Sequence, residues 1–256
     1  VVERVLSPAS PLHHEATTLL AEDPTLAASS DLLHHAVLGA IANGAVTAGT
    51  ISTQVGRPVS NLSPTINRLV DAGFVVRHED PVRKQRPLYA LADPYLQFHY
   101  AVLEPHRTVL RSRDLHDVWA NRLRTIFDAR VRGPVFEQMA RTWVERFAAA
   151  EELGGVIDHV GPSFATIDGV EHELDVVVAA GDGAPAERTI VAIGEAKAGE
   201  TITARHVARL ERARASFGPR ASAAKLLLFG ADFDLGPTER DRPDVVLVDL
   251  SRLHGT

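Results

Sequence analysis

The sequence predicts an α/β chain, with a mostly helical N-terminal half followed by a mixed β-sheet flanked by helices. Apolar residues at helical spacing dominate up to about residue 148. Beyond it, unbroken apolar runs at 225–229 and 245–249 are typical of strands that are covered on both faces. The chain has 256 residues, of which 45% are hydrophobic, so it can bury one or two sizeable cores.

Residues 31–104 follow the element order of a winged helix-turn-helix. Three helices, over 32–43, 50–55 and 63–72, are expected before a hairpin of strands 74–77 and 88–91. Ser63-Pro64 places a capping residue before a proline, which predicts the start of the third helix there. The segment 78–86 then forms the loop of the wing.

A winged helix can contact DNA through its third helix and its wing. The expected nucleic-acid contacts are Asn61, Thr65, Asn67, Arg68, Arg77, Arg83, Lys84 and Arg86. Against this, residues 31–104 hold only six basic and six acidic side chains, a thin positive charge for binding a polyanion. Winged helices also serve as protein-docking or dimerisation modules, so both uses remain open.

The rest of the chain divides around this module. Residues 1–30 are expected to form a linker helix, and residues 105–133 an Arg-rich helical connector that Gly133-Pro134 ends. Residues 134–256 are expected to form a second domain, with a helix, three strands, a helix and two strands in that order. Its segment 151–200 holds eleven acidic and two basic side chains, which suits a metal site or an ordinary solvated surface.

Asp175, Glu195 and Lys197 are the most informative residues of this second domain. They lie in two apolar, strand-like runs, 172–178 and 189–197, where charges are costly unless they are paired, hydrated or bound to a metal. Because side chains alternate along a strand, Glu195 and Lys197 share one face. Two carboxylates can hold Mg²⁺, and a nearby lysine can orient or help deprotonate a water molecule. The alternative is that the same residues form a salt bridge at the end of the sheet and bind no metal.

Several classes of function are disfavoured. The chain has no cysteine, which excludes disulfides and thiolate zinc sites, and its twelve histidines form no zinc-ligand pair. No apolar run has membrane-spanning length and no signal peptide is evident, so a cytoplasmic protein without membrane contact is expected. The segment 194–201 matches a phosphate-binding P-loop except that Glu200 replaces its lysine, so no ATP is expected to bind there.

Four motifs together resemble a known family. YALADPYLQFHY, FEQMA, HELDVVV and IVAIGEAKAGE occur in the order found in the C-terminal half of archaeal-type AAA ATPases. In that family an ATPase domain precedes a winged helix and a domain of unknown function numbered 234 (DUF234), which is similar to PD-(D/E)xK nucleases. The resemblance covers about residues 7–250 and implies a restriction-endonuclease-like sheet over 134–256. It also implies that the ATPase domain, own or separate, is a partner that this chain lacks.

The resemblance implies roles for individual residues. The superfamily's helix glutamate corresponds to Glu137, its strand aspartate to Asp175, and its (D/E)xK pair to Glu195 and Lys197. Asp175 and Glu195 would hold Mg²⁺ or Mn²⁺, with the carbonyl of Ala196 as a further ligand. Lys197 would position the attacking water and Glu137 would support the metal indirectly. Leucine stands before Asp175 where the motif has proline, a departure that the superfamily tolerates.

Three functions follow as hypotheses. The first is a metal-dependent DNA endonuclease-like hydrolase that the winged helix targets to DNA. The second is a DNA-binding regulatory module without turnover, and the third is a protein-interaction module of the ATPase, for which an oligomer remains open. Retention of all four site residues favours the first hypothesis, whereas the weak basic surface favours the third.

Overall fold

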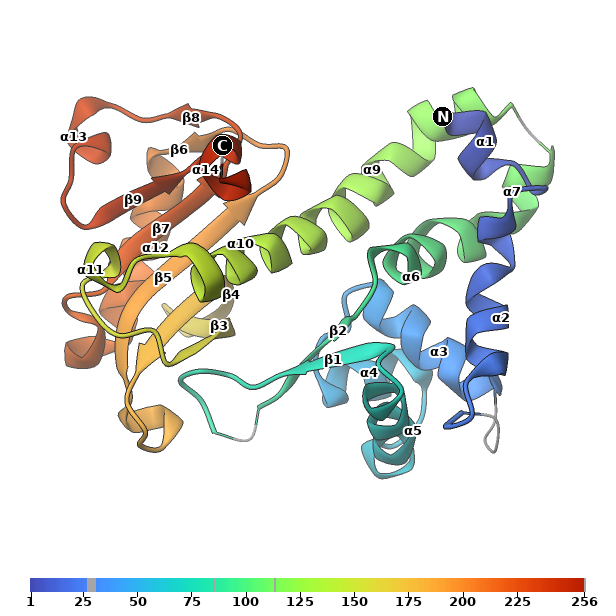
Figure 1. The fold of residues 1–256 in the computed structure, drawn as a ribbon, viewed down its shortest axis with the longest axis horizontal. Helices are drawn as coiled ribbons and strands as arrows, with labels where there is room; N and C mark the ends of the chain where they lie inside the picture. The colour runs from blue at the N-terminus through green and yellow to red at the C-terminus, as the bar shows by residue number, and fades with distance from the viewer. Residues whose placement is uncertain (27–30, 85, 113, 256) are drawn as a thin grey trace. The chain divides into compact units, whose positions relative to one another are not determined.

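The computed structural model describes residues 1–26, 31–84, 86–112 and 114–255 (Figure 1). The chain forms two compact units. Unit 1 comprises Val1–His78 and Pro87–Arg132, and unit 2 comprises Glu79–Arg86 and Gly133–Thr256. Residues 27–30 of the expected N-terminal linker lie outside the described residues.

Unit 1 contains the helices and the hairpin of a winged helix. The elements are α3 (Asp31–Ala42), α4 (Ala48–Val55), α5 (Val59–Asp71), β1 (Val75–His78) and β2 (Leu88–Leu91). Thr47 and Thr50 form a capping box at the start of α4, and Gly56 ends this helix with a φ of 71°. The two strands pair antiparallel, from Val75 with Leu91 to His78 with Leu88. The predicted element order is therefore confirmed.

The start predicted for the third helix was wrong. Helix α5 begins at Val59, and Pro64 lies inside it. The earlier start brings Leu62, Thr65, Ile66 and Leu69 onto one buried stripe, and this burial outweighs the backbone hydrogen bond that Pro64 cannot donate. Ser63 does not cap the helix, because its hydroxyl donates to the Val59 carbonyl at 2.9 Å.

The remaining elements of unit 1 are helical. They are α1 (Val2–Leu6), η1 (Pro11–His13), α2 (Glu15–Glu22), α6 (Pro94–Phe98), η2 (His99–Leu103), η3 (Glu104–His106), α7 (Arg107–Ser112), α8 (Leu115–Val118), η4 (Trp119–Leu123), α9 (Arg124–Phe127) and η5 (Asp128–Arg132). Leu6 and Leu20 from the N-terminal helices share a core with α3, α5, α6 and η2. The N-terminal segment is thus part of the packed unit.

Unit 2 is built on a five-stranded mixed sheet. Its strands are β3 (His159–Ile167), β4 (Val170–Ala180), β5 (Thr189–Lys197), β7 (Lys225–Gly230) and β9 (Val245–Val248), in the spatial order β3-β4-β5-β7-β9. The first three strands pair antiparallel, and β5, β7 and β9 pair parallel. The apolar run 156–160 predicts the first strand of this unit, but β3 begins only at His159.

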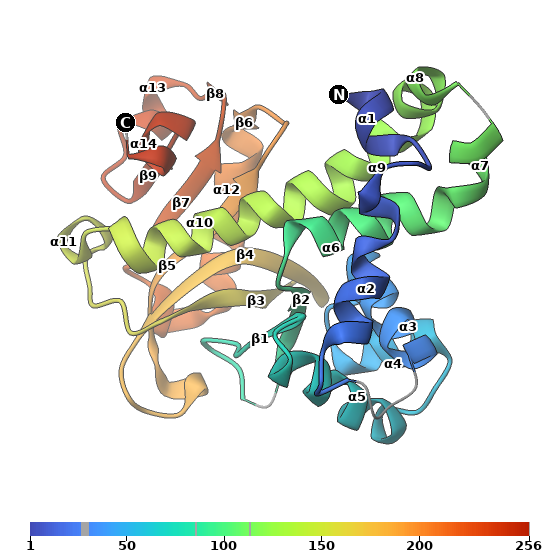
Figure 2. The same cartoon turned by 45° about the vertical axis from the view of Figure 1, so that its right-hand side comes forward.

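Helices cover both faces of this sheet, as predicted (Figures 1 and 2). Helix α10 (Gly133–Phe147) packs on one face through Phe136, Ala140, Trp143 and Val144, and α12 (Ala204–Ser216) packs on the other through Val207 and Leu210. The smaller elements are α11 (Ala150–Leu153), η6 (Pro185–Glu187), β6 (Ile202–Thr203), η7 (Gly218–Ala221), β8 (Phe233–Asp234), α13 (Pro237–Arg240) and α14 (Leu250–His254).

The buried stripe of α10 differs from the predicted one. Helical spacing predicts that Met139 and Phe147 are buried together with Phe136 and Trp143, but Met139 and Phe147 are 36% and 69% exposed. Gly133 and Pro134 are the first residues of α10 and follow η5 directly, so the break predicted at Gly133-Pro134 is wrong. Pro134 has no N–H to donate to the preceding turn, where the Arg130 carbonyl accepts from the Gln97 side chain. No helix in the described part of the chain is both long and apolar enough to cross a membrane.

Candidate functional site

Asp175 and Glu195 meet where β4 and β5 stop pairing. The antiparallel ladder runs up to Val176 opposite Gly194, so Asp175 and Glu195 are the next pair along the two strands. On its other edge, β4 has a bulge in which Asp175 and Val176 together oppose the single Pro162 of β3. A bulge redirects side chains locally. The fold therefore places both carboxylates at one end of the sheet.

Glu195 is the centre of a charged cluster, although only 3% of its surface is exposed. Its Oε1 accepts from the Lys197 ammonium at 2.9 Å and from Arg209 Nη1 of α12 at 2.8 Å. Arg209 Nη2 also donates to the backbone carbonyl of Glu173 on β4 at 2.9 Å. The second carboxylate oxygen, Oε2, is buried and has no hydrogen-bond partner in the described part of the protein. A buried oxygen of this kind is costly unless it binds a donor or a cation.

Asp175 is held by the backbone of the neighbouring strand. Its Oδ2 accepts from the Ala196 N–H at 2.8 Å. Burial raises the pKa of Asp175, although Lys197 and this hydrogen bond oppose the shift. Because a strand residue presents its N–H and its C=O to the same neighbour, the Ala196 carbonyl also faces the β4 side.

Lys197 is held in its charged form. Burial disfavours the ammonium, but the carboxylates of Asp175 and Glu195 more than compensate and raise the pKa of Lys197. A lysine with a raised pKa does not take up a proton from water at neutral pH. Of the two roles considered for Lys197, orienting a water molecule fits the structure and deprotonating it does not.

Glu137 and Arg141 approach Asp175 from helix α10. Arg141 is buried, and its Nη1 donates to the Asp175 carbonyl at 2.8 Å. Burial, followed by the charge of Asp175, raises the pKa of Glu137 to about 7. A glutamate in the first turn of a helix is typically solvated, and the sequence pattern alone predicts this for Glu137. That prediction is wrong, because the buried stripe of α10 turns this half-buried residue toward the sheet.

The raised pKa of Glu137 has a consequence for stability. The folded protein holds this proton more tightly than the unfolded chain, so the free energy of unfolding falls as the pH rises from about 4.5 to about 7. We expect Glu137→Gln to stabilise the protein at pH 8 by on the order of 1–2 kcal/mol and to have little effect at pH 4.5. Thermal unfolding at both pH values measures this difference. Glu145→Gln, at an exposed position of the same helix, is the matched control and should change neither value. Equal stabilisation by both variants would contradict the assignment.

The donors at this site fit a divalent cation. No group of three His, Asp or Glu side chains within the described ranges has the arrangement of a metal site. The available oxygens are instead Asp175, the free Oε2 of Glu195 and the Ala196 carbonyl, which is the mixed carboxylate and carbonyl set that Mg²⁺ and Mn²⁺ accept with water completing the shell.

Helix α5 presents a polar face to solvent. Asn61, Asn67 and Arg68 are exposed, and Asn61 and Arg68 lie two turns apart on the same side of the helix. Thr65, which had been predicted to face outward, is only 5% exposed and lies in the buried stripe with Leu62 and Ile66. The prediction that Thr65 contacts nucleic acid is therefore wrong.

The described residues of the wing loop, 79–84 and 86, belong to unit 2. Arg86 binds both carboxylate oxygens of Glu171 at 2.6 and 2.7 Å, and Arg83 binds Glu171 at 2.7 Å. These two hydrogen-bonded guanidinium groups lower the pKa of Glu171 to about 2. Buried Asp80 accepts from the Ser163 hydroxyl at 2.8 Å and anchors the loop to β3. Of the predicted wing contacts, Lys84 and Arg77 remain exposed.

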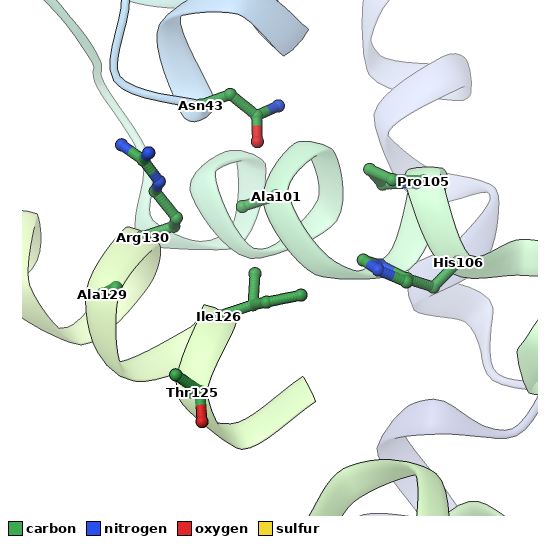
Figure 3. Close-up of a pocket in the computed structure, with 8 residues that line it drawn as sticks. All are labelled: Asn43, Ala101, Pro105, His106, Thr125, Ile126, Ala129 and Arg130. Carbon is green, nitrogen blue, oxygen red and sulfur yellow. The ribbon is translucent and has the colours of Figure 1, made fainter. Parts of the chain in front are cut away.

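Unit 1 has a small cavity of about 290 Å³ among its helices (Figure 3). Its lining residues are Asn43, Ala101, Pro105, His106, Thr125, Ile126, Ala129 and Arg130. No acidic side chain is among these lining residues, and their polar side chains are Asn43, His106, Thr125 and Arg130.

Sequence patterns did not identify three residues that matter for these sites. Arg209 and Arg141 reach the carboxylates from α12 and α10, and Glu171 pairs with the wing. Each contact joins positions that are far apart in the chain, so no local spacing signals it. The predicted order of a helix, three strands and a helix is the available clue for Arg141 and Arg209, since it indicates which helices flank the paired strands.

Comparison with known proteins identifies part of unit 1. Residues 30–86 match the model of the MarR family. No curated protein matches the chain. Two solved structures are similar to it: the reduced form of MarR from E. coli, 22% identical over 43% of this chain and 79% of its own, and the PcaV transcriptional regulator from Streptomyces coelicolor in complex with its natural ligand, 18% identical over 46% and 84%. Both TM-scores are 0.26, so the assignment of a MarR-type winged helix stands on the family match and the observed elements.

Proposed function

We propose that this chain binds DNA through helix α5 and hydrolyses a nucleic-acid phosphodiester in unit 2, with Mg²⁺ or Mn²⁺ as cofactor. The observation that carries the hydrolytic part is the pairing of Asp175 with Glu195 at the end of β4 and β5, with Glu195 Oε2 buried and without a partner. The MarR-family match over residues 30–86 and the exposed Asn61 and Arg68 support DNA as the substrate.

The residues of the site suit this reaction. Asp175, Glu195 and the Ala196 carbonyl would hold the cation, which when bound polarises the phosphate and acidifies a water molecule. Lys197, charged and bound to Glu195, would orient that water and offset the negative charge that develops on the phosphate. Arg141 fixes the backbone of Asp175, and Glu137 beside it would support the carboxylates from α10.

The order of α10, three antiparallel strands, α12 and two parallel strands supports a restriction-endonuclease-like fold for unit 2. Together with the four quoted motifs, this order supports the larger proposal that the chain corresponds to the C-terminal region of an archaeal-type AAA ATPase with a DUF234 domain. An ATPase domain, own or separate, would then be its partner.

A second candidate is a DNA-binding regulatory module without turnover. The observation in its favour is the ion pair of Arg209 with Glu195 Oε1, which already offsets the charge of the carboxylate that a metal would need. The wing arginines that are paired with Glu171 leave less free positive charge for DNA, and this also suits a module that docks proteins.

Cleavage of plasmid and single-stranded DNA tests the proposed function. The chain is incubated with either substrate in Mg²⁺, Mn²⁺ or EDTA, beside Asp175→Asn. If the parent cleaves DNA only with metal and Asp175→Asn does not cleave it, the result supports the hydrolase. Binding that weakens with salt, without cleavage in any metal, supports the regulatory module. If the chain neither binds nor cleaves, both DNA proposals fail and protein docking stands.

The wing can be tested separately through Glu171. If Arg83 and Arg86 contact phosphate when released, Glu171→Gln should raise affinity for duplex DNA, since a neutral amide holds guanidinium groups less tightly than a carboxylate. We expect a gain of roughly threefold to tenfold in fluorescence anisotropy at low salt, and a steeper dependence on salt concentration. Glu187→Gln, in an exposed turn of the same unit, removes one charge without touching the wing. An equal gain in DNA affinity for both variants would show that the change in net charge causes the effect, and it would contradict a role of Arg83 and Arg86.

A further inference from the structure

The charged cluster of unit 2 contains a cation that the proposed hydrolysis does not use. Arg209 lies on α12, and its guanidinium bridges the two strands that carry the site. One nitrogen binds Glu195 Oε1 on β5 at 2.8 Å and the other binds the Glu173 carbonyl on β4 at 2.9 Å. Arg209 thus neutralises the carboxylate to which a metal would bind.

We infer that Arg209 is a built-in competitor of the divalent cation for Glu195, and that it sets the affinity of this site for metal. The inference rests on the proposed function, because it concerns the same two carboxylates. The carboxylates of Asp175 and Glu195 repel each other when no metal is bound, and Lys197 offsets only part of this repulsion. The guanidinium of Arg209 offsets more of it.

The geometry shows how a metal and Arg209 compete. The guanidinium occupies Oε1 while Oε2 stays free, so a cation can enter only through Oε2 or by displacing the ion pair. In either case it meets a carboxylate whose charge Lys197 and Arg209 already share. Two positive groups within hydrogen-bonding distance of one ligand weaken the binding of a third.

Arg209 can leave Glu195 without loss of the fold. It is half-buried at the surface of α12, while the packing of this helix on the sheet comes from Val207, Leu210 and Ala213. Arg209 would therefore act as a positioning residue, which changes the binding of the metal through Glu195.

Binding of Mn²⁺ to the full chain in the absence of nucleic acid tests the inference, by electron paramagnetic resonance of free Mn²⁺ and by calorimetry. Arg209→Ala should bind Mn²⁺ at least tenfold more tightly than the parent, and Arg209→Lys, which keeps the charge but loses the two-point contact, should lie between them. Arg212→Ala is the matched control, because it removes one exposed arginine from the same helix. Thermal unfolding of each variant without metal shows that all of them fold.

The outcomes separate the two proposals. Tighter binding by Arg209→Ala, with Arg212→Ala equal to the parent, supports the inference. Equal affinity of Arg209→Ala and the parent, with binding lost in Asp175→Asn, overturns the inference and leaves the proposed hydrolase intact. Absence of Mn²⁺ binding in the parent and in Arg209→Ala overturns both proposals.

Discussion

Replacing Lys197 with Ala should reduce the rate of metal-dependent cleavage by about 10²–10³-fold, the range for loss of one donor that stabilises charge in a transition state. The ammonium lies 2.9 Å from Glu195, and neighbouring carboxylates keep it charged. Its removal deprives the reaction of a donor but leaves Asp175, Glu195 and the Ala196 carbonyl in place. Single-turnover cleavage rates, measured beside Mn²⁺ affinity, separate these two effects.

We expect Lys197→Ala to retain Mn²⁺ binding while turnover is lost. Lys225→Ala is a suitable control, because Lys225 begins β7 opposite Ala192, at the end of the β5–β7 ladder away from Lys197, and donates to the Pro243 carbonyl at 2.6 Å. A variant at Lys197 that keeps the parental cleavage rate would contradict the role assigned to the ammonium. Parallel loss of metal binding and cleavage would show that Lys197 holds the site together and has no separate part in the chemistry.

Replacing Asn61 and Arg68 together with Ala should weaken binding to duplex DNA by roughly a hundredfold, since each contact to a base edge contributes about 1–3 kcal/mol. Both side chains are exposed on one side of α5. The measurement is fluorescence anisotropy in EDTA, which prevents cleavage, with a duplex selected by the parent protein from a random pool. The two single variants show whether the losses add.

Arg124→Ala removes one exposed arginine of unit 1 away from α5, and it should leave the affinity within about twofold of the parent. A loss in the α5 variants of no more than this size would exclude α5 as the recognition helix. A loss confined to Arg68→Ala, equal for all duplexes and accompanied by a weaker salt dependence, would instead assign Arg68 to the phosphate backbone.

Local signals predicted the elements of the winged helix but not the limits of its recognition helix. Gly56 ends α4 where the sequence predicts that this helix stops, and its backbone is left-handed. Ser63-Pro64 is an equally strong local signal, yet the apolar spacing from Leu62 to Leu69 overrides it and buries Thr65 as well. Where capping and burial disagree, the larger free energy of burying a stripe of side chains decides the helix boundary.

The sequence predicted that Asp175, Glu195 and Lys197 lie together, but it did not predict the arginine that pairs with Glu195. Alternation along β5 is sufficient to place Glu195 beside Lys197, and antiparallel pairing brings Asp175 to the same end of the sheet. The bulge at Asp175 and Val176 has no sequence signature, because it depends on how β3 pairs with β4. The contact of Arg209 with Glu195 was not predicted, because it joins a helix to a strand and no sequence spacing signals such a contact.

Crystals of the full chain grown with Mn²⁺ test the central claim most directly, by anomalous scattering at the manganese absorption edge. We expect one strong anomalous peak bonded to Asp175 and to Oε2 of Glu195, with the guanidinium of Arg209 moved away from Oε1. Saturating Mn²⁺ without a peak there, and with the Arg209–Glu195 ion pair unchanged, would show that these carboxylates serve as a salt bridge and do not bind metal.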